Sequence, residues 1–209
     1  MQIRWSNIMV QTVSILGING RFGQECAKAF VAAGWRVIGM GRDNRAQLEG
    51  VQFMKGDAND PAQLRAAVAD ADVVVNGLNL PYDKWEKGRA EAQLERVLGV
   101  LKGSGKTLMF PGNIYNYGAK QHVISPDTPQ HPEKEKGRIR KRMEEQLQRA
   151  SGEGLQVLIV RLADFFAPHA VQTNFDLMLL QRIRSGVIQY VGDLSRKHSW
   201  AYLPDVGRV

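Results

Sequence analysis

The sequence contains a single cysteine among its 209 residues, and it lacks any long apolar run. One cysteine, Cys26, excludes a framework of intrachain disulfides and fits a reducing cytoplasm. No membrane-spanning helix is predicted, because such a helix needs a continuous apolar run of about 18 residues. The first seven residues include no apolar core of a signal peptide, so we expect a cytoplasmic protein. Cys26 falls within a predicted helix, where a small buried apolar role is favoured over a nucleophile.

Histidines are also few, and they are scattered. The four histidines do not cluster at the spacing of metal ligands, so no metal site is predicted; they are His122, His131, His169 and His198. The net charge is +7, with part of the basic excess in residues 134–142. No aromatic residues interleave with that block to stack on bases. A solvated helix face is therefore favoured, and no nucleic-acid or membrane partner is expected.

Strand-like apolar segments alternate with helix-like segments along the chain. The predicted strands are residues 13–16, 35–40, 51–54, 71–76, 106–110 and 155–160. The predicted helices are residues 21–33, 60–69, 84–101 and 133–150. This alternation is typical of βαβ units with right-handed crossovers. We therefore predict an α/β protein with a doubly wound parallel sheet and helices on both faces.

No linker marks a second domain, so residues 1–209 are expected to form one domain. The pattern is less regular toward the end of the chain. Residues 174–185 are predicted as a helix capped by Gly186, residues 187–191 as a short strand, and residues 203–206 as the start of another helix.

The most informative stretch is Gly17-Ile-Asn-Gly20-Arg-Phe-Gly23, between the first predicted strand and the first helix. Three glycines at this spacing are typical of a turn that binds a dinucleotide pyrophosphate. Gly17 would permit the tight turn, Gly20 would let the backbone approach phosphate, and Gly23 would let the helix pack on the strand. On this spacing alone, ordinary glycine turns are an alternative. The other loop residues expected to contact the cofactor are Asn19, Arg21 and Phe22.

Ligands of open parallel sheets bind beyond the carboxyl ends of the strands. Arg42 follows the second predicted strand, where a basic residue accommodates the 2′-phosphate of NADP and a carboxylate would bind the ribose of NAD. Arg45 is a candidate second cation. Asp43 lies one residue after the position expected for a ribose-binding carboxylate, so NAD remains an alternative cofactor. For Arg42, the alternative interpretation is a solvent-exposed loop residue with no role in binding. We therefore expect NADP(H) to be preferred, with NAD(H) as the alternative.

Further contacts are expected after the next three strands. A carboxylate after the third strand could accept a hydrogen bond from the adenine amino group. Small residues after the fourth would let a cofactor lie against the strand end, and reacting groups are expected after the fifth. The candidate residues are Asp57, Ala58, Asn76, Gly77, Leu78, Pro111, Gly112 and Asn113.

These motifs, in this order, resemble the extended or atypical short-chain dehydrogenase/reductase superfamily, and more narrowly its NAD-dependent epimerase/dehydratase group. The resemblance implies a Rossmann fold that binds NAD(P). Residues 160–166 resemble the loop that closes over the nicotinamide, which places Phe166 at the cofactor, and residues 192–206 resemble the stretch before the family's aspartate. Extended members continue into a substrate lobe. The resemblance therefore implies a reduced or truncated lobe here, with residues 165–209 forming its start.

Family members carry Ser or Thr after the fifth strand and a Tyr-x-x-x-Lys motif on the next helix, where the tyrosine is the general acid/base. Lys141 matches the lysine, which implies a role in holding the nicotinamide ribose. Gly137 stands at the tyrosine position, and Pro111 or Gly112 stands at the Ser/Thr position. Tyr115, or Asn113 by hydrogen bonding, is the candidate replacement; a structural role for Tyr115 is the alternative.

Two functions are therefore implied by the resemblance. The first is hydride transfer between a nicotinamide cofactor and a carbonyl, alcohol or nucleotide-sugar substrate. The second is a catalytically weak or inactive NADP(H)-sensing module that regulates a partner protein, which the missing catalytic groups favour. The family also implies a homodimer through the helices at residues 84–101 and 133–150.

Overall fold

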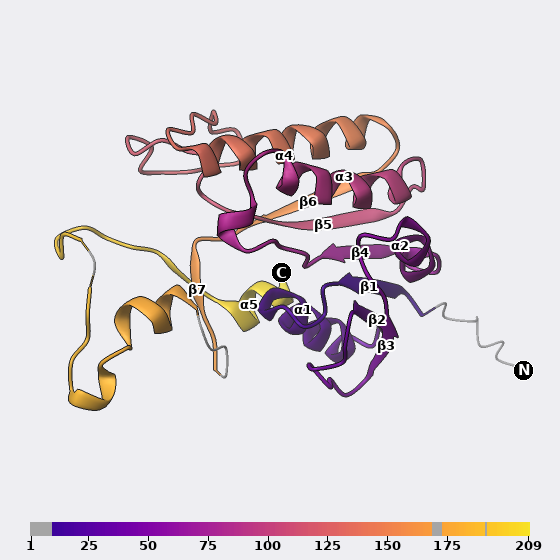
Figure 1. Ribbon diagram of the computed structural model, residues 1–209, viewed down its shortest axis with the longest axis horizontal. Coiled ribbons are helices and arrows are strands. Elements are labelled where there is room, and N and C mark those ends of the chain that lie inside the picture. The colour runs from indigo at the N-terminus through magenta and orange to yellow at the C-terminus, as the bar shows by residue number, and fades with distance from the viewer. Residues whose placement is uncertain (1–9, 169–172, 191) are drawn as a thin grey trace, which may run out of the picture.

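The structure is a computed structural model that describes residues 10–168, 173–190 and 192–209. Its main sheet has six parallel strands in the order β3-β2-β1-β4-β5-β6 (Figure 1). The strands are β1 (Thr12–Leu16), β2 (Arg36–Gly41), β3 (Val51–Lys55), β4 (Val73–Asn76), β5 (Thr107–Gly112) and β6 (Gln156–Arg161). The chain leaves β1 first toward β2 and β3, and then returns to place β4 on the other side of β1. The predicted doubly wound α/β fold is confirmed, and the switch point lies between β1 and β4.

Helices cover both faces of this sheet (Figure 1). They are α1 (Arg21–Ala32), α2 (Pro61–Val68), α3 (Arg89–Leu101), α4 (Glu135–Gly152) and α5 (Leu203–Arg208). One core lies between the sheet and α2, α3 and α4, and includes Leu94, Leu108 and Leu147. The other lies between the sheet and α1, and includes Val13, Ile15 and Cys26. Because both faces are covered, the central strand β1 is buried along its whole length, as its apolar sequence requires.

A local sequence signal sets the start of α2 where the sequence predicted it. Helix α2 begins with Pro61, and the Asp60 carboxylate accepts hydrogen bonds from the backbone N–H groups of Ala62 and Gln63 at 2.8 and 3.3 Å. These N–H groups have no partner within the helix, so the carboxylate stabilises its first turn.

Two predicted helices are shorter or different in the structure. The helix predicted at 84–101 begins only at Arg89, because Lys87 and Gly88 take left-handed backbone angles (φ 60° and 73°); a 3₁₀ turn, η1 (Tyr82–Lys84), precedes them. The helix predicted at 174–185 is replaced by a π-helical turn, η2 (Phe175–Leu179), and a 3₁₀ turn, η3 (Ile183–Ser185). Gly186, predicted as the cap of that helix, is the C-cap of η3 and has a left-handed conformation (φ 70°). Residues 187–190 form no strand, and Val191 lies outside the described residues.

A second, two-stranded sheet lies beyond the main one and was not predicted. Strand β7 (Asp164–Phe166) pairs in parallel with β8 (Trp200–Tyr202). The described residues between them, 173–190 and 192–199, extend away from the main sheet, drawn in orange to yellow in Figure 1. Helix α5 then packs on α1, and a Cβ on Gly207 would lie only 2.6 Å from the Glu25 carbonyl oxygen. The small residue therefore allows this close helix contact.

Candidate functional site

The three glycines of the first loop lie where side chains would collide with backbone. Gly17 has φ +81°, and a Cβ there would lie 2.9 Å from the carbonyl carbon and oxygen of Gly77. A Cβ on Gly20 would lie 3.2 Å, and one on Gly23 2.8 Å, from the Gly17 carbonyl oxygen. The loops after β1 and β4 therefore touch through their main chains. This contact leaves the surface at the switch point free of side-chain bulk.

Helix α1 begins directly after this turn. Gly20 is its N-cap residue, and no described side chain caps the helix there. The first-turn N–H groups of a helix have no partner within it, and they carry the positive end of its dipole. The start of α1 is therefore suited to an anionic group such as a diphosphate.

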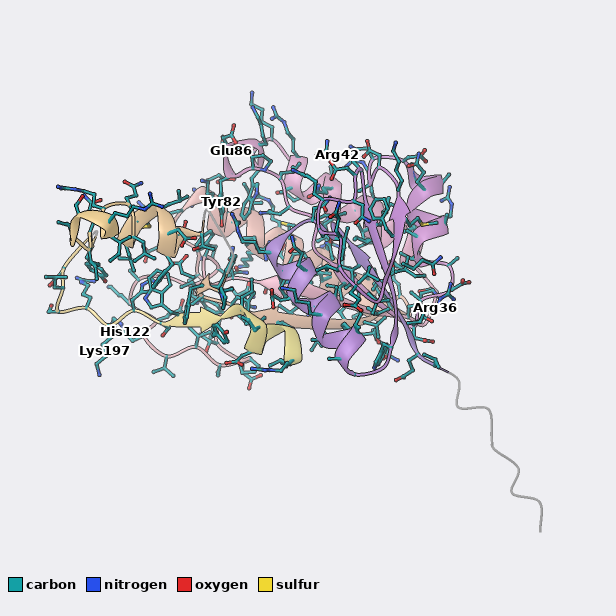
Figure 2. The ribbon with its side chains drawn as sticks, turned by 90° about the horizontal axis from the view of Figure 1, so that it is seen from below. Arg36, Arg42, Tyr82, Glu86, His122 and Lys197 are labelled. Carbon is teal, nitrogen blue, oxygen red and sulfur yellow. The ribbon has the colours of Figure 1, made fainter. Side chains whose placement is uncertain are left out.

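A first cavity of about 540 Å³ lies beyond the carboxyl ends of β1 to β4. Figure 2 locates this edge through the labelled ends of β2: Arg36 begins the strand, and Arg42 follows it on the cavity side. The predicted cofactor residues that line this cavity are Gly17, Asn19, Gly20, Arg42, Asp57, Ala58, Gly77 and Leu78.

The loop after β2 is fixed to the glycine loop by one side chain. The Asn19 amide nitrogen donates to the backbone oxygen and the carboxylate of Asp43, at 2.8 and 2.9 Å, and its amide oxygen accepts from the Ala46 N–H at 3.0 Å. Asp43 also pairs with Arg45 at 2.8 Å, and this hydrogen bond is the main reason that the pKa of its carboxyl lies below the usual value. The charges of Asp43 and Arg45 therefore neutralise each other. The positive charge of Arg42, which lines the same cavity, is not neutralised by this pair.

A second cavity of about 300 Å³ lies beyond β5, with Gly20, Gly77, Leu78 and Asn79 in common with the first. The two cavities are therefore neighbours along the carboxyl edge of the sheet, and together they are named the path. The predicted site residues that line the second cavity are Gly20, Arg21, Phe22, Gly77, Leu78, Pro111, Gly112, Asn113 and Tyr115. The lining residues that sequence reasoning did not single out include Tyr82, Trp85, Phe110, Arg140 and Asp164.

Four predicted cofactor residues line neither cavity. Gly23 is buried against Gly17, where it serves packing, and Asn76 is buried with its side-chain oxygen accepting the Leu78 N–H at 3.2 Å. Phe166, in β7 of the second sheet, stacks on Phe175 of η2, with ring centroids 5.3 Å apart. Lys141 lines a separate hollow with His131 and Glu145.

The glycine at the family's tyrosine position is enclosed by backbone. A Cβ on Gly137 would overlap the carbonyl oxygen of Tyr115 and lie 2.8 Å from the Pro132 Cβ. The first turn of α4 thus packs against the loop after β5, in the space that a side chain would need. Glycine in place of the family's tyrosine therefore alters how α4 packs against the loop after β5, in addition to removing a catalytic hydroxyl.

Arg140, rather than Lys141, faces the second cavity from α4. Adjacent helix residues project about 100° apart, so a shift of one position moves a side chain to another face. The Arg140 side chain is buried: its Nη2 donates to the Pro111 carbonyl, and its guanidinium lies 4.7 Å from the Phe110 ring centroid and 5.7 Å from that of Trp85. Burial lowers its pKa to about 10, so it remains a cation at neutral pH.

Tyr115 and Tyr82 approach each other at the mouth of this cavity, with ring centroids 6.5 Å apart. Burial, and then a hydrogen bond with Tyr82, raise the pKa of Tyr115 above its usual value. The hydroxyl therefore stays protonated at neutral pH and is able to donate a hydrogen bond. The side chain of Asn113 is engaged locally, where its oxygen accepts the Tyr115 N–H at 3.1 Å.

Below this loop, β6 and α4 are joined by a charge pair. Arg161 binds the Glu144 carboxylate through both terminal nitrogens, at 2.9 and 2.8 Å, and donates to the Asn113 carbonyl at 2.5 Å. Gln130 also donates to Glu144, at 2.6 Å. These contacts hold the loop after β5 against α4.

The described parts of the chain contain no group of three or more metal-ligating side chains, and His169 lies outside them. Within the same residues, no helix combines the length and apolar character that crossing a membrane would require.

The model of the NAD dependent epimerase/dehydratase family matches residues 13–209. The chain therefore belongs to this family, as its motifs predicted. No curated protein matches the sequence.

Several solved structures share the fold. The Bordetella bronchiseptica enzyme WbmH in complex with NAD+ has 22% identity and a TM-score of 0.74, over 96% of this chain and 70% of that one. UDP-glucose 4-epimerase from Brucella ovis in complex with NAD has 18% identity and a TM-score of 0.75, over 95% and 71% of the two chains. UDP-N-acetylglucosamine 4-epimerase from Bacillus cereus has 14% identity and a TM-score of 0.80, over 95% and 69%.

Proposed function

We propose that this chain binds a nicotinamide dinucleotide, preferably NADP(H), and transfers hydride to or from a small carbonyl or alcohol substrate. The observation that carries this proposal is the path formed by the two neighbouring cavities, which meet at the glycine loop and the switch point of the sheet. Dinucleotides bind across such a crevice, with the pyrophosphate at the start of the first helix. Family membership, and the NAD present in two of the similar structures, support the same assignment.

The residues present fit such a ligand. Side chains on Gly17 or Gly77 would collide with backbone atoms at the crossing point, and one on Gly20 would be in tight contact, so main-chain atoms form the surface there. In the proposed binding mode, Asp57 and Ala58 lie at the adenine end and Pro111 and Gly112 lie at the nicotinamide end. When bound, this cofactor supplies a hydride donor or acceptor at C4 of its nicotinamide ring.

The preference for NADP(H) depends on Arg42. It lines the first cavity after β2, where a 2′-phosphate is accommodated in this fold. Asp43, the carboxylate that would favour NAD, is held by Asn19 and Arg45. A charge-assisted contact of this kind contributes about 1.5–3 kcal/mol.

Tyr115 is the proposed proton donor to the substrate oxygen, and the Asn113 amide is a candidate hydrogen-bonding group beside it. The raised pKa of Tyr115 keeps its hydroxyl protonated, which is the form that a donor needs, but it also makes complete proton transfer harder than from an unperturbed phenol. Lys141 has no role in this proposal because it lines another hollow, while the cation beside the reacting end is Arg140.

The second candidate is an NADP(H)-sensing module without turnover, which regulates a partner protein. The specific observation in its favour is Gly137, whose surroundings leave no room for the family's tyrosine. Binding of the dinucleotide is common to both candidates, and catalysis separates them.

Calorimetric titration of NADPH and NADH into the full chain tests cofactor binding. Arg42→Ser should weaken NADPH by about 10- to 100-fold and change NADH little, as expected for loss of one charged contact. Arg36→Ser is the matched control, since Arg36 lies at the opposite end of the same strand (Figure 2). Equal losses for both dinucleotides would remove the proposed 2′-phosphate contact. Failure of the parent chain to bind either one at millimolar concentration would refute the proposal.

Absorbance of the reduced nicotinamide, followed with a panel of aldehydes, ketones and nucleotide sugars, then separates the two candidates. Turnover that Tyr115→Phe abolishes supports the oxidoreductase with Tyr115 as donor. Tight binding without turnover supports the sensor.

The organisation of residues 1–209 as one domain, a cytoplasmic location and a homodimer through α3 and α4 are kept as part of this proposal. These two helices lie side by side on one face of the sheet and are linked by the Arg142–Glu91 pair at 2.8 Å (Figure 1). Sedimentation equilibrium of the full chain tests the dimer, and a single monomeric species at micromolar concentration would exclude it.

A further inference from the structure

Arg140 is a buried cation without a carboxylate partner. Its side chain is only 6% exposed, and no described carboxylate lies within ion-pair distance of it. The carboxylate with the largest electrostatic influence on Arg140 is Glu144, whose two oxygens are already bound by Arg161 and Gln130. Removing a charge from water without a counter-ion is costly, so this arrangement calls for an explanation.

The hydrogen bonds of Arg140 are also incomplete. Its Nη2 binds the Pro111 carbonyl, but its Nε is buried and has no acceptor among the described residues. The rings of Phe110 and Trp85 lie against the guanidinium and limit its movement. A buried donor that lacks a partner is destabilising unless a ligand satisfies it.

The surroundings of Arg140 suit one small anion. The second cavity, which Arg140 lines, has a volume of about 300 Å³ and lies at the proposed nicotinamide end. Asp164 also lines this cavity, and its carboxylate accepts a hydrogen bond from Asn174 at 2.6 Å and lies 3.1 Å from the His198 Nε2. The lining carries two guanidinium groups, those of Arg21 and Arg140, and one carboxylate, that of Asp164, so its net charge of about +1 favours a singly charged group over a doubly charged phosphate. The planar fork of an arginine matches the geometry of a carboxylate.

We propose that Arg140 binds a carboxylate group of the substrate in the second cavity, which makes the substrate class a small carbonyl or hydroxy compound bearing one carboxylate. This inference rests on the proposed function, because it places the anion beside the nicotinamide end of the path. Arg140 contributes binding and orientation, and the proposal assigns it no proton transfer.

The test uses oxamate as a carboxylate probe and methyl oxamate as its neutral counterpart. Each is titrated by calorimetry into the full chain, with and without saturating NADPH. Oxamate should bind at least about tenfold more tightly than methyl oxamate, since only the anion can complete the Arg140 contacts. Inorganic phosphate is titrated in parallel, and tighter binding of phosphate than of oxamate would overturn the choice of a carboxylate.

Variants of α4 then locate the contact. Arg140→Met removes the charge at similar volume and should weaken oxamate by about 30- to 100-fold while leaving methyl oxamate unchanged. Arg138→Met is the matched control: it removes the same charge two residues away, from an exposed side chain that lines the other hollow, and should bind oxamate as the parent does. If Arg140→Met does not fold, Arg140→Lys keeps the charge without the planar fork and should weaken oxamate about tenfold.

Equal affinities of the parent for oxamate and methyl oxamate would overturn the inference, as would unchanged oxamate binding by Arg140→Met. NADPH binding is measured in the same titrations. If the parent binds NADPH but binds oxamate no more tightly than methyl oxamate, the carboxylate site is refuted and the proposed function stands. Oxamate discrimination without any NADPH binding would support the carboxylate site and refute the proposed function.

Discussion

Replacing Gly137 by alanine should destabilise this protein, although Gly→Ala within a helix is usually favourable. The new Cβ would overlap the Tyr115 carbonyl oxygen and lie 2.8 Å from the Pro132 Cβ. Overpacking of a buried site costs about 1–3 kcal/mol, and a backbone oxygen cannot rotate aside, so we expect about 3 kcal/mol. The gain in helix propensity, about 0.5–1 kcal/mol, offsets part of this cost. The net loss of about 2 kcal/mol should lower Tm by roughly 4–8 °C for a chain of this length.

Gly99→Ala provides the control for helix propensity. Gly99 lies in α3, is exposed, and a Cβ there would meet no atom within 4 Å. This variant should gain about 0.5–1 kcal/mol. Urea unfolding, followed by circular dichroism and tryptophan fluorescence, gives both free energies of unfolding.

A Gly137→Ala variant as stable as the parent would contradict the packing described for α4. A second comparison tests the same contact through function. Gly137→Tyr restores the family motif in sequence, yet it should be less stable than Gly137→Ala and should show no gain in turnover. An increase in turnover would mean that the loop after β5 can move away from α4.

Three further predictions concern single side chains. Burial raises the pKa of the Cys26 thiol to about 12, so a thiol reagent at pH 8 should label the native protein only after unfolding, and rapid native labelling would contradict its burial. Backbone hydrogen bonds lower the pKa of Asp60 from 3.8, so the contribution of its carboxylate to stability is complete above pH 3.8 and is lost as the pH falls through the lowered pKa. The difference in urea midpoint between the parent and Asp60→Ala should therefore shrink on acidification. A difference that stays constant would exclude the charged cap. Glu144→Gln leaves Arg161 without its carboxylate and should cost about 2–3 kcal/mol of unfolding free energy, whereas a neutral effect would show that the pair contributes no net stability.

Much of the fold could be predicted because its signals are local. The alternation of apolar strands and helices, and the spacing of Gly17, Gly20 and Gly23, are legible within short windows of sequence. The late start of α3 follows from left-handed angles at Lys87 and Gly88, which the apolar pattern of the helix does not report. Strands β7 and β8 have three residues each and pair across a long connection, so neither carries a local signal.

Arg140, the cation of α4 that lines the second cavity, was not predicted, because motif spacing does not report which face of a helix a residue occupies. Lys141 matches the family pattern by position, but α4 turns it into another hollow. The buried stripe of α4 includes Ile139, Met143 and Leu147, and Arg140 precedes Met143 by three residues on that same stripe. An arginine on an apolar stripe was the available signal.

The excursion between β7 and β8 is attached to the molecule at both of its ends. At one end, β7 follows β6 of the main sheet. At the other end, β8 pairs with β7 and leads into α5, which packs on α1. A single protease cut at an exposed position such as Leu194 would therefore leave two fragments that stay together until the protein is denatured. The nicked protein should run as one species on gel filtration and as two bands under denaturing conditions.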